Sequence, residues 1–247
     1  MSLKLVAQKP FYREKRFLFP VSIKEFTRAL TKEGVEGELI KTILISLITS
    51  FIILGIFYVL KLRHIEKFIS KQSFYVFFAV LSYALLLPSI RHVRAYKEFP
   101  CMTGMMIGMT LGMIAGFLSG FYVGATNGMF YGSIFGIAIG IFFGIENGKC
   151  CGIMGIMEGV MAGFMGGLMG AMTALMVLND HLKATGIIIF IIAGCILFGL
   201  NFTLYKETRE AERKHKDSEF FTVVLSLILS VITIGIMVFG PRSVLFQ

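Results

Sequence analysis

A glycine recurs at every fourth position of this chain from Gly104 to Gly152, which makes thirteen glycines without a gap. The residues between them are almost all apolar, so the segment cannot be a solvated, flexible linker. In a helix a four-residue period forms one narrow stripe, and glycine in that stripe lets a neighbouring backbone approach closely. Membrane strands instead alternate apolar and polar residues in pieces of about 10 residues. This glycine series therefore predicts tightly packed helices in lipid.

Composition and segment lengths extend this prediction to the whole chain. Of its 247 residues 56% are hydrophobic and only 16% are charged, a balance typical of membrane proteins. We expect an all-α polytopic membrane protein with about seven transmembrane helices, because an apolar stretch of about 20 residues crosses the hydrocarbon of a bilayer. A Gly/Met-rich core of spans 3–5 is expected between aliphatic helices. The expected spans are 40–60, 73–90, 101–125, 129–145, 151–178, 184–205 and 219–240.

The rest of the chain lies outside this transmembrane domain, 39–240. Residues 1–38 are expected to form a cytoplasmic, interfacial amphipathic segment, since Ser22 and Glu25 fit a capping box and apolar residues follow at helical spacing. Residues 243–247 resemble the remnant of a protease site left after removal of a tag. We leave that remnant out of the functional argument.

The basic residues predict how the chain is oriented in the cell membrane. An N-terminus in the cytoplasm places seventeen Lys and Arg residues inside and six outside. The segment 61–71 is basic although it falls outside, so a re-entrant first hairpin is the alternative. The net charge of +9 lies beside the spans, which favours contact with anionic lipid headgroups over binding of nucleic acid.

The glycine period also limits how the helices can cross. Four residues turn a straight helix by about 400°, so the stripe advances about 40° per repeat. A single straight neighbour cannot follow such a stripe, and we expect right-handed crossings or contacts with more than one helix. Turns are expected at 126–128 and 146–149. The glycines assigned to helix packing are Gly104, Gly108, Gly112, Gly116, Gly120, Gly124, Gly132, Gly136, Gly140, Gly144, Gly155, Gly159 and Gly163.

Methionine is concentrated in the same part of the chain, with thirteen of the fifteen methionines between residues 102 and 176. Spacings of three and four place them in single-face stripes of the third and fifth spans. A thioether is a soft ligand that selects Cu(I) or a similar ion, whereas the alternative is that methionine fills gaps beside glycine. The methionines assigned to metal binding are Met102, Met106, Met109, Met113, Met154, Met157, Met161, Met165 and Met169.

Cysteines and one carboxylate accompany these stripes. Cys101 opens the third span and Cys150 and Cys151 open the fifth, so we expect all three at the cytoplasmic end as thiolate metal ligands. Incidental thiols and redox chemistry are the alternatives. Glu158 lies well inside a span, and we expect it to point into the bundle or a wet cavity. There it would offset the charge of a cation or carry a proton, unless a threonine hydroxyl holds it neutral.

The other polar candidates lie at helix ends or in loops. His181 follows Asn179 and Asp180 at the outer end of the fifth span, where it is either a metal ligand or part of a polar helix end. Cys195 is expected in the apolar core of its span. The histidines expected in solvated loops are His64, His92 and His215.

Two short patterns resemble known metal transporters. The pairing of Met-x-x-x-Met with Gly-x-x-x-Gly, at 102–106 and 165–169, resembles Ctr-type copper transporters. The vicinal Cys150 and Cys151 at a span end are similar to those of mercuric-ion membrane transporters. These resemblances imply sulfur ligation only, because both families have fewer spans and lack such a glycine series.

We therefore predict a membrane transporter or channel for a soft transition-metal cation, with Cu(I) as the substrate and no prosthetic group. The sequence has no nucleotide-binding, metalloprotease or serine-nucleophile motif, so no enzymatic activity is expected. The expected partner is the lipid bilayer, with a homo-oligomer and a metallochaperone as further candidates. One alternative is a non-enzymatic scaffold or assembly protein in which the Gly and Met stripes serve packing. A membrane thiol oxidoreductase would require a second cysteine pair.

Overall fold

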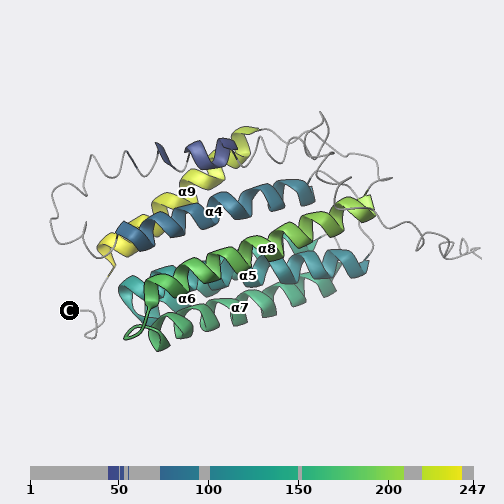
Figure 1. Ribbon diagram of the computed structural model, residues 1–247. Coiled ribbons are helices and arrows are strands. Elements are labelled where there is room, and N and C mark those ends of the chain that lie inside the picture. Colours follow the sequence, from purple (N-terminus) through teal and green to yellow (C-terminus); the bar gives the residue numbers. More distant parts are fainter. Residues whose placement is uncertain are drawn as a thin grey trace, which may run out of the picture.

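The computed structural model describes residues 44–49, 51–52, 55, 73–94, 101–149, 152–208 and 219–240, and these residues contain helices and no strand (Figure 1). Five of the described helices are long and apolar enough to cross a membrane, in agreement with the expected helical membrane class. The total of seven spans stays a prediction. The helices are α4 (Ser73–Arg94), α5 (Cys101–Asn127), α6 (Met129–Gly148), α7 (Gly152–Met176), α8 (Leu182–Thr208) and α9 (Glu219–Phe239), and the first five of these contain the candidate spans.

The helix ends differ from the predicted ends at several places. The break between α5 and α6 falls at Gly128, whose φ of 104° is a conformation that L side chains rarely adopt. The prediction for the segment 146–149 was wrong at its start, because Glu146 and Asn147 still belong to helix α6. Of the first expected span only a few helical residues are described. The segments 1–38 and 243–247 lie outside the described residues.

Helices α5, α6 and α7 pack backbone against backbone at glycines, and we refer to them as the glycine-packed trio. A Cβ atom added to Gly116 of α5 would lie 2.8 Å from the carbonyl oxygen of Gly163 in α7. A Cβ added to Gly140 of α6 would lie 2.8 Å from the Cα of Gly163 and 2.9 Å from the Cα of Gly116. Real Cβ atoms essentially never approach other atoms below 3.0 Å, so only glycine fits here.

These contacts recur every four residues and form layers with one residue from each helix. Residue numbers rise together along α5 and α7 and fall along α6, so α5 and α7 are parallel and α6 is antiparallel to both. A glycine such as Gly116 or Gly140 contacts both other helices, so the stripes meet more than one neighbour, as the four-residue period predicts. The layers are Gly108–Gly148–Gly155, Gly112–Gly144–Gly159, Gly116–Gly140–Gly163, Gly120–Gly136–Gly167 and Gly124–Gly132–Ala171.

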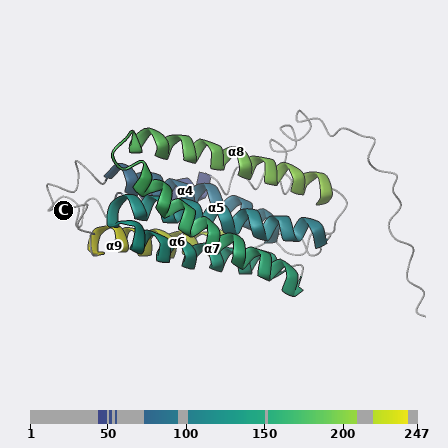
Figure 2. The same cartoon turned by 90° about the horizontal axis from the view of Figure 1, so that it is seen from below.

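Helices α4, α8 and α9 are attached to the trio differently, through large side chains and hydrogen bonds. Helix α4 packs against α5, α8 and α9, and Figure 2 shows α8 and α9 along opposite edges of α4. The Tyr83 hydroxyl of α4 lies 2.8 Å from the Thr233 hydroxyl of α9. The Tyr122 hydroxyl of α5 donates to the carbonyl oxygen of Gly186 in α8 at 3.2 Å. Asn127 donates to the carbonyl oxygen of Ile236 in α9 at 2.8 Å.

Candidate functional site

The methionine stripes lie on the outside of the glycine-packed trio. The stripe methionines of α5 are 42–75% exposed, and those of α7 are 41–76% exposed. Glycine occupies the helix contacts themselves, so these side chains do not fill the gaps beside it. Together with Glu158 we refer to these residues as the methionine face. It consists of Met102, Met106, Met109, Met113, Met154, Met157, Met161, Met165, Met169, Met172, Met176 and Glu158.

A second row of small residues on α7 sets the register of this face against α5. Gly166 lies against the backbone of Met113, and Gly170 lies against the backbone of Phe117. Both pairs advance by four residues, as expected for parallel helices. The same step one turn earlier brings Ala162 level with Met109, and Ala162 is accordingly buried, at 5% exposed.

One further step brings Glu158 level with Met105, at the edge where the α5–α7 contact meets the outer surface. Both side chains are partly buried. Met154 and Met161 lie one turn away from Glu158 along α7, at i−4 and i+3, and Met109 lies one turn beyond Met105 along α5. The register therefore brings a carboxylate and thioether ligands from two helices to one level of the bundle.

Glu158 is six residues into α7, which is about 9 Å along the helix axis and inside the apolar span. A carboxylate that faces lipid at such a depth is costly. Two of the threonines considered as its partners use their hydroxyl hydrogens within their own helices. Thr110 donates to the carbonyl oxygen of Met106, and Thr173 donates to that of Met169, each at 2.7 Å.

The cysteines can be placed only by the helix ends beside them. Cys101 begins α5, and its side chain lies outside the described residues, as do Cys150 and Cys151. Since α5 and α7 are parallel, the helix ends that adjoin all three cysteines lie at the same end of the trio. Their grouping as a metal-binding mouth stays a prediction. Among the described residues, no three His, Cys, Asp or Glu side chains gather closely enough to hold a metal ion.

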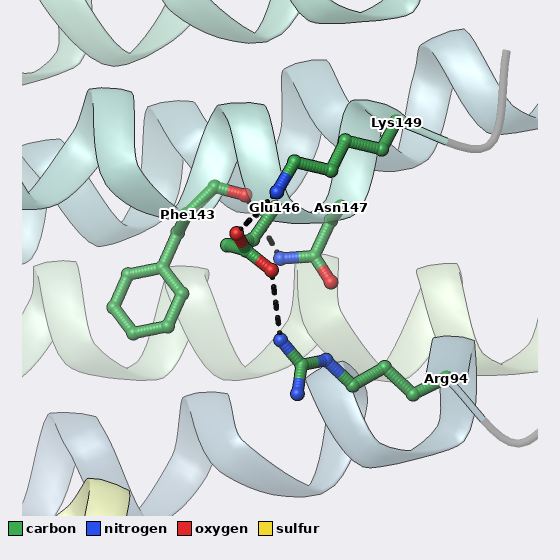
Figure 3. Close-up of polar contacts among 5 residues, drawn as sticks. All are labelled: Arg94, Phe143, Glu146, Asn147 and Lys149. Atoms are coloured by element: carbon green, nitrogen blue, oxygen red, sulfur yellow. Dashed lines mark hydrogen bonds and ion pairs between the residues drawn. The ribbon is translucent and has the colours of Figure 1, made fainter. Parts of the chain in front are cut away.

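An ion-pair cluster that the sequence analysis missed lies at this same end (Figure 3). Arg94 of α4 donates to one carboxylate oxygen of Glu146 at 3.0 Å, and Lys149 donates to the other at 2.6 Å. Asn147 donates to the carbonyl oxygen of Phe143 at 2.8 Å. Glu146 thereby links the end of α4 to the end of α6. The i,i+3 spacing of Glu146 and Lys149 was a usable signal, but nothing in it pointed to Arg94.

His92 was wrongly expected in a solvated loop. Helix α4 continues beyond its predicted end to Arg94, and α8 packs against it, so His92 is only 2% exposed. Its Nδ1 lies 3.1 Å from the side-chain oxygen of Asn201 in α8, and the Asn201 amide donates to the Ser89 hydroxyl at 3.0 Å. This polar contact joins α4 and α8 near the ion-pair cluster.

The expected position of Cys195 differs from the structure, whereas His181 lies at the helix end where it was expected. Cys195 was expected in the core but is exposed on α8, because a helix that is aliphatic on every side gives no indication of which side faces inward. His181 lies in the turn after α7, at the opposite end from Glu158, and its side chain is 92% exposed. Its Nε2 is 4.0 Å from the neighbouring Asp180 carboxylate. The structure therefore places His181 near the Met176 end of α7, away from Glu158.

Comparisons with known proteins add no further assignment, since no family model, curated protein or solved structure matches this chain. The class of the protein follows from its fold alone. In the part of the chain that the structure describes, five helices are long and apolar enough to cross a membrane.

Proposed function

We propose that this protein transports a soft transition-metal cation, with Cu(I) as the substrate, along the methionine face of α5 and α7. The supporting observation is the exposure of that face. Stripe methionines that served only as filler beside glycine would lie at the helix contacts, whereas they are 41–76% exposed. Their sulfur atoms are therefore accessible as ligands, and thioether sulfur selects soft ions such as Cu(I).

Contact with lipid does not explain the methionines either. The outer side of α8 is built from branched aliphatic residues that are 40–58% exposed. Lipid requires nothing more than such a surface, yet the outer sides of α5 and α7 use methionine. The difference in composition between these outer surfaces supports a role for the thioether itself. The residues of α8 in question are Ile187, Ile188, Ile191, Ile192 and Ile196.

Glu158 gives this face the charge that a cation needs. The register places it level with Met105, with Met154, Met161 and Met109 one turn away. A carboxylate among neutral thioethers offsets the charge of a bound cation, which thioethers alone cannot do. Further thioethers along both helices would pass the ion by ligand exchange. The expected thiolates of Cys101 and the vicinal cysteine pair would bind it at the end of the path.

Binding of Cu(I) to the purified protein tests this proposal. We would measure affinity and stoichiometry without oxygen, in competition with a chromophoric Cu(I) chelator. A variant carrying Met105→Leu, Met109→Leu and Met161→Leu is expected to bind at least about tenfold more weakly, a loss of about 1.4 kcal/mol. Glu158→Gln should weaken binding as well.

The matched control is Met129→Leu, which changes an exposed methionine of α6 outside the methionine face. It should bind like the wild type. The Ser variant of Cys101, Cys150 and Cys151 tests the expected mouth separately. Negligible Cu(I) binding by the wild type, or equal binding by the wild type and the triple Leu variant, would contradict the proposal.

A scaffold or assembly protein is the second candidate. The same exposed methionines favour it, because methionine is common on binding surfaces that adapt to a partner. Leucine would then replace the methionines without loss of assembly, and wild-type protein would bind no Cu(I). The chelator competition therefore also separates the two functions.

A further inference from the structure

We propose that a second copy of this chain covers the methionine face, so that the ion-binding groups of neighbouring copies meet at their interface. This inference deepens the proposed function, because it names the partner that closes the ion path. The reason is that the methionine face carries a carboxylate inside the span, and a carboxylate in contact with lipid is costly.

The methionine face requires a cover other than lipid. Glu158 lies inside the span and is only partly buried by its own chain. Within the described residues, α7 packs mainly against α5 and α6, and it lies at the bottom edge of the bundle in Figure 1. A carboxylate there, or a cation moving from thioether to thioether, would be exposed to hydrocarbon at a high cost. A second protein surface removes that cost.

Membrane insertion favours a second copy as this cover. All copies of one chain are inserted in the same orientation, so a symmetry axis that relates them runs along the membrane normal. Every residue then meets its counterpart at the same depth. Methionine rows would face methionine rows, and Glu158 would face Glu158. A different protein would have to match both the rows and the depth of the carboxylate independently.

The charges of the methionine face fit this arrangement. Residues 101–127 of α5 and 152–176 of α7 include one carboxylate, Glu158, and no Lys or Arg. Two such faces bring carboxylates together without a basic partner, so a cation between them would offset their mutual repulsion. The proposed cationic substrate supplies that positive charge, and it would strengthen the association of copies.

The size of the methionine face is also adequate. The 25 residues of α7 span about 37 Å. Two adjacent helices, each about 10 Å wide with its side chains, therefore present on the order of 700 Å², close to the roughly 800 Å² per partner of a standard interface. Flexible methionine side chains can interdigitate there without a preformed complementary shape.

Photo-crosslinking in membranes tests the inference on the full-length chain. Benzoylphenylalanine would be introduced at Met161 of the methionine face, or at Ile191 of α8 as the matched control. The two side chains are 67% and 58% exposed. Copies with two different affinity tags would be expressed together and irradiated, and products that carry both tags would be counted.

We expect doubly tagged product from position 161 in the presence of a metal chelator, and at least about tenfold less from position 191. With the crosslinker at Met169 instead, which leaves the thioethers nearest Glu158 in place, added Cu(I) should raise the yield when Glu158 is present and leave it unchanged in Glu158→Gln. No doubly tagged product from position 161, equal yields from both positions, or capture of another protein at 161 would overturn the inference.

These results are independent of the proposed function. Crosslinking of two copies without any Cu(I) binding to the wild type would support the second copy and refute metal transport. Cu(I) binding without crosslinking between copies would support metal transport and refute the second copy.

Discussion

The glycine-packed trio and the helices around it are held together by different interactions. In α5, α6 and α7, backbone meets backbone at glycine in all layers but the last, where the small side chain of Ala171 lies against Gly124. Helices α4, α8 and α9 attach through buried aromatic and aliphatic side chains and through hydrogen bonds such as Tyr83–Thr233. The trio therefore needs few of its large side chains for internal contacts. Its methionines are left on the surface, where they are available for ligands or partners.

The largest expected effect on stability comes from adding a single methyl group inside the trio. Gly140→Ala would place a Cβ within 3.0 Å of backbone atoms of both Gly163 and Gly116. Overpacking of this kind costs about 1–3 kcal/mol or more. Thermal unfolding in detergent, followed by circular dichroism, should show a clearly lower midpoint for this variant.

Gly199→Ala in α8 is the matched control, because nothing lies within 4 Å of a Cβ added there. It should be neutral or stabilise the helix by about 0.5–1 kcal/mol, since alanine is the better helix former. If both variants unfolded at the same temperature, the trio would not be held by its glycine contacts.

A smaller effect is expected where the surrounding helices use side chains. Tyr83→Phe removes the hydrogen bond from α4 to Thr233 in α9 while the ring stays in place. Interhelical hydrogen bonds in membrane proteins contribute about 0.6 kcal/mol on average and at most about 1.7. Thr233 keeps its own bond to the carbonyl oxygen of Leu229, so no donor is left unpaired there.

A double-mutant cycle with Thr233→Val would isolate this pair in the same unfolding measurement. Tyr131→Phe on the exposed side of α6 serves as the control. Additive effects of Tyr83→Phe and Thr233→Val would show that the contact contributes nothing to stability.

The smallest effect on stability is expected on the methionine face. Met161→Leu and Met165→Leu change side chains that are 67% and 52% exposed and fill no internal gap. Each should change the free energy of unfolding by less than about 0.5 kcal/mol, as is usual for surface positions. A loss comparable to that of Gly140→Ala would mean that these methionines pack inside an assembly even in detergent.

The sequence predicted the helices and the glycine contacts more fully than the surface. A period of four identifies a stripe of glycine whatever surrounds it, and the polar break at 126–128 predicted the turn that the structure has at Gly128. The direction in which the methionines point could not be read in the same way. In a membrane both the outside and the inside of a bundle are apolar, so a methionine stripe is compatible with either.

The sequence also could not predict which residues of the three helices lie at the same level of the trio. Gly166 lies against Met113 because parallel helices settle into one of several equivalent registers. The register that the helices adopt places Glu158 level with Met105. Long-range contacts such as Arg94 with Glu146 and His92 with Asn201 depend on how α4 packs, and no local pattern encodes that.

The regularity of the glycine layers has a consequence for motion within the trio. Because the layers repeat every four residues, sliding α7 by one layer, about 6 Å, would rebuild nearly the same backbone contacts. Ala171 interrupts this equivalence, since the slide in one direction would bring its methyl group to the place of Gly167, where a Cβ has no room. A single methyl group thus distinguishes this register from the neighbouring one in an otherwise repetitive assembly.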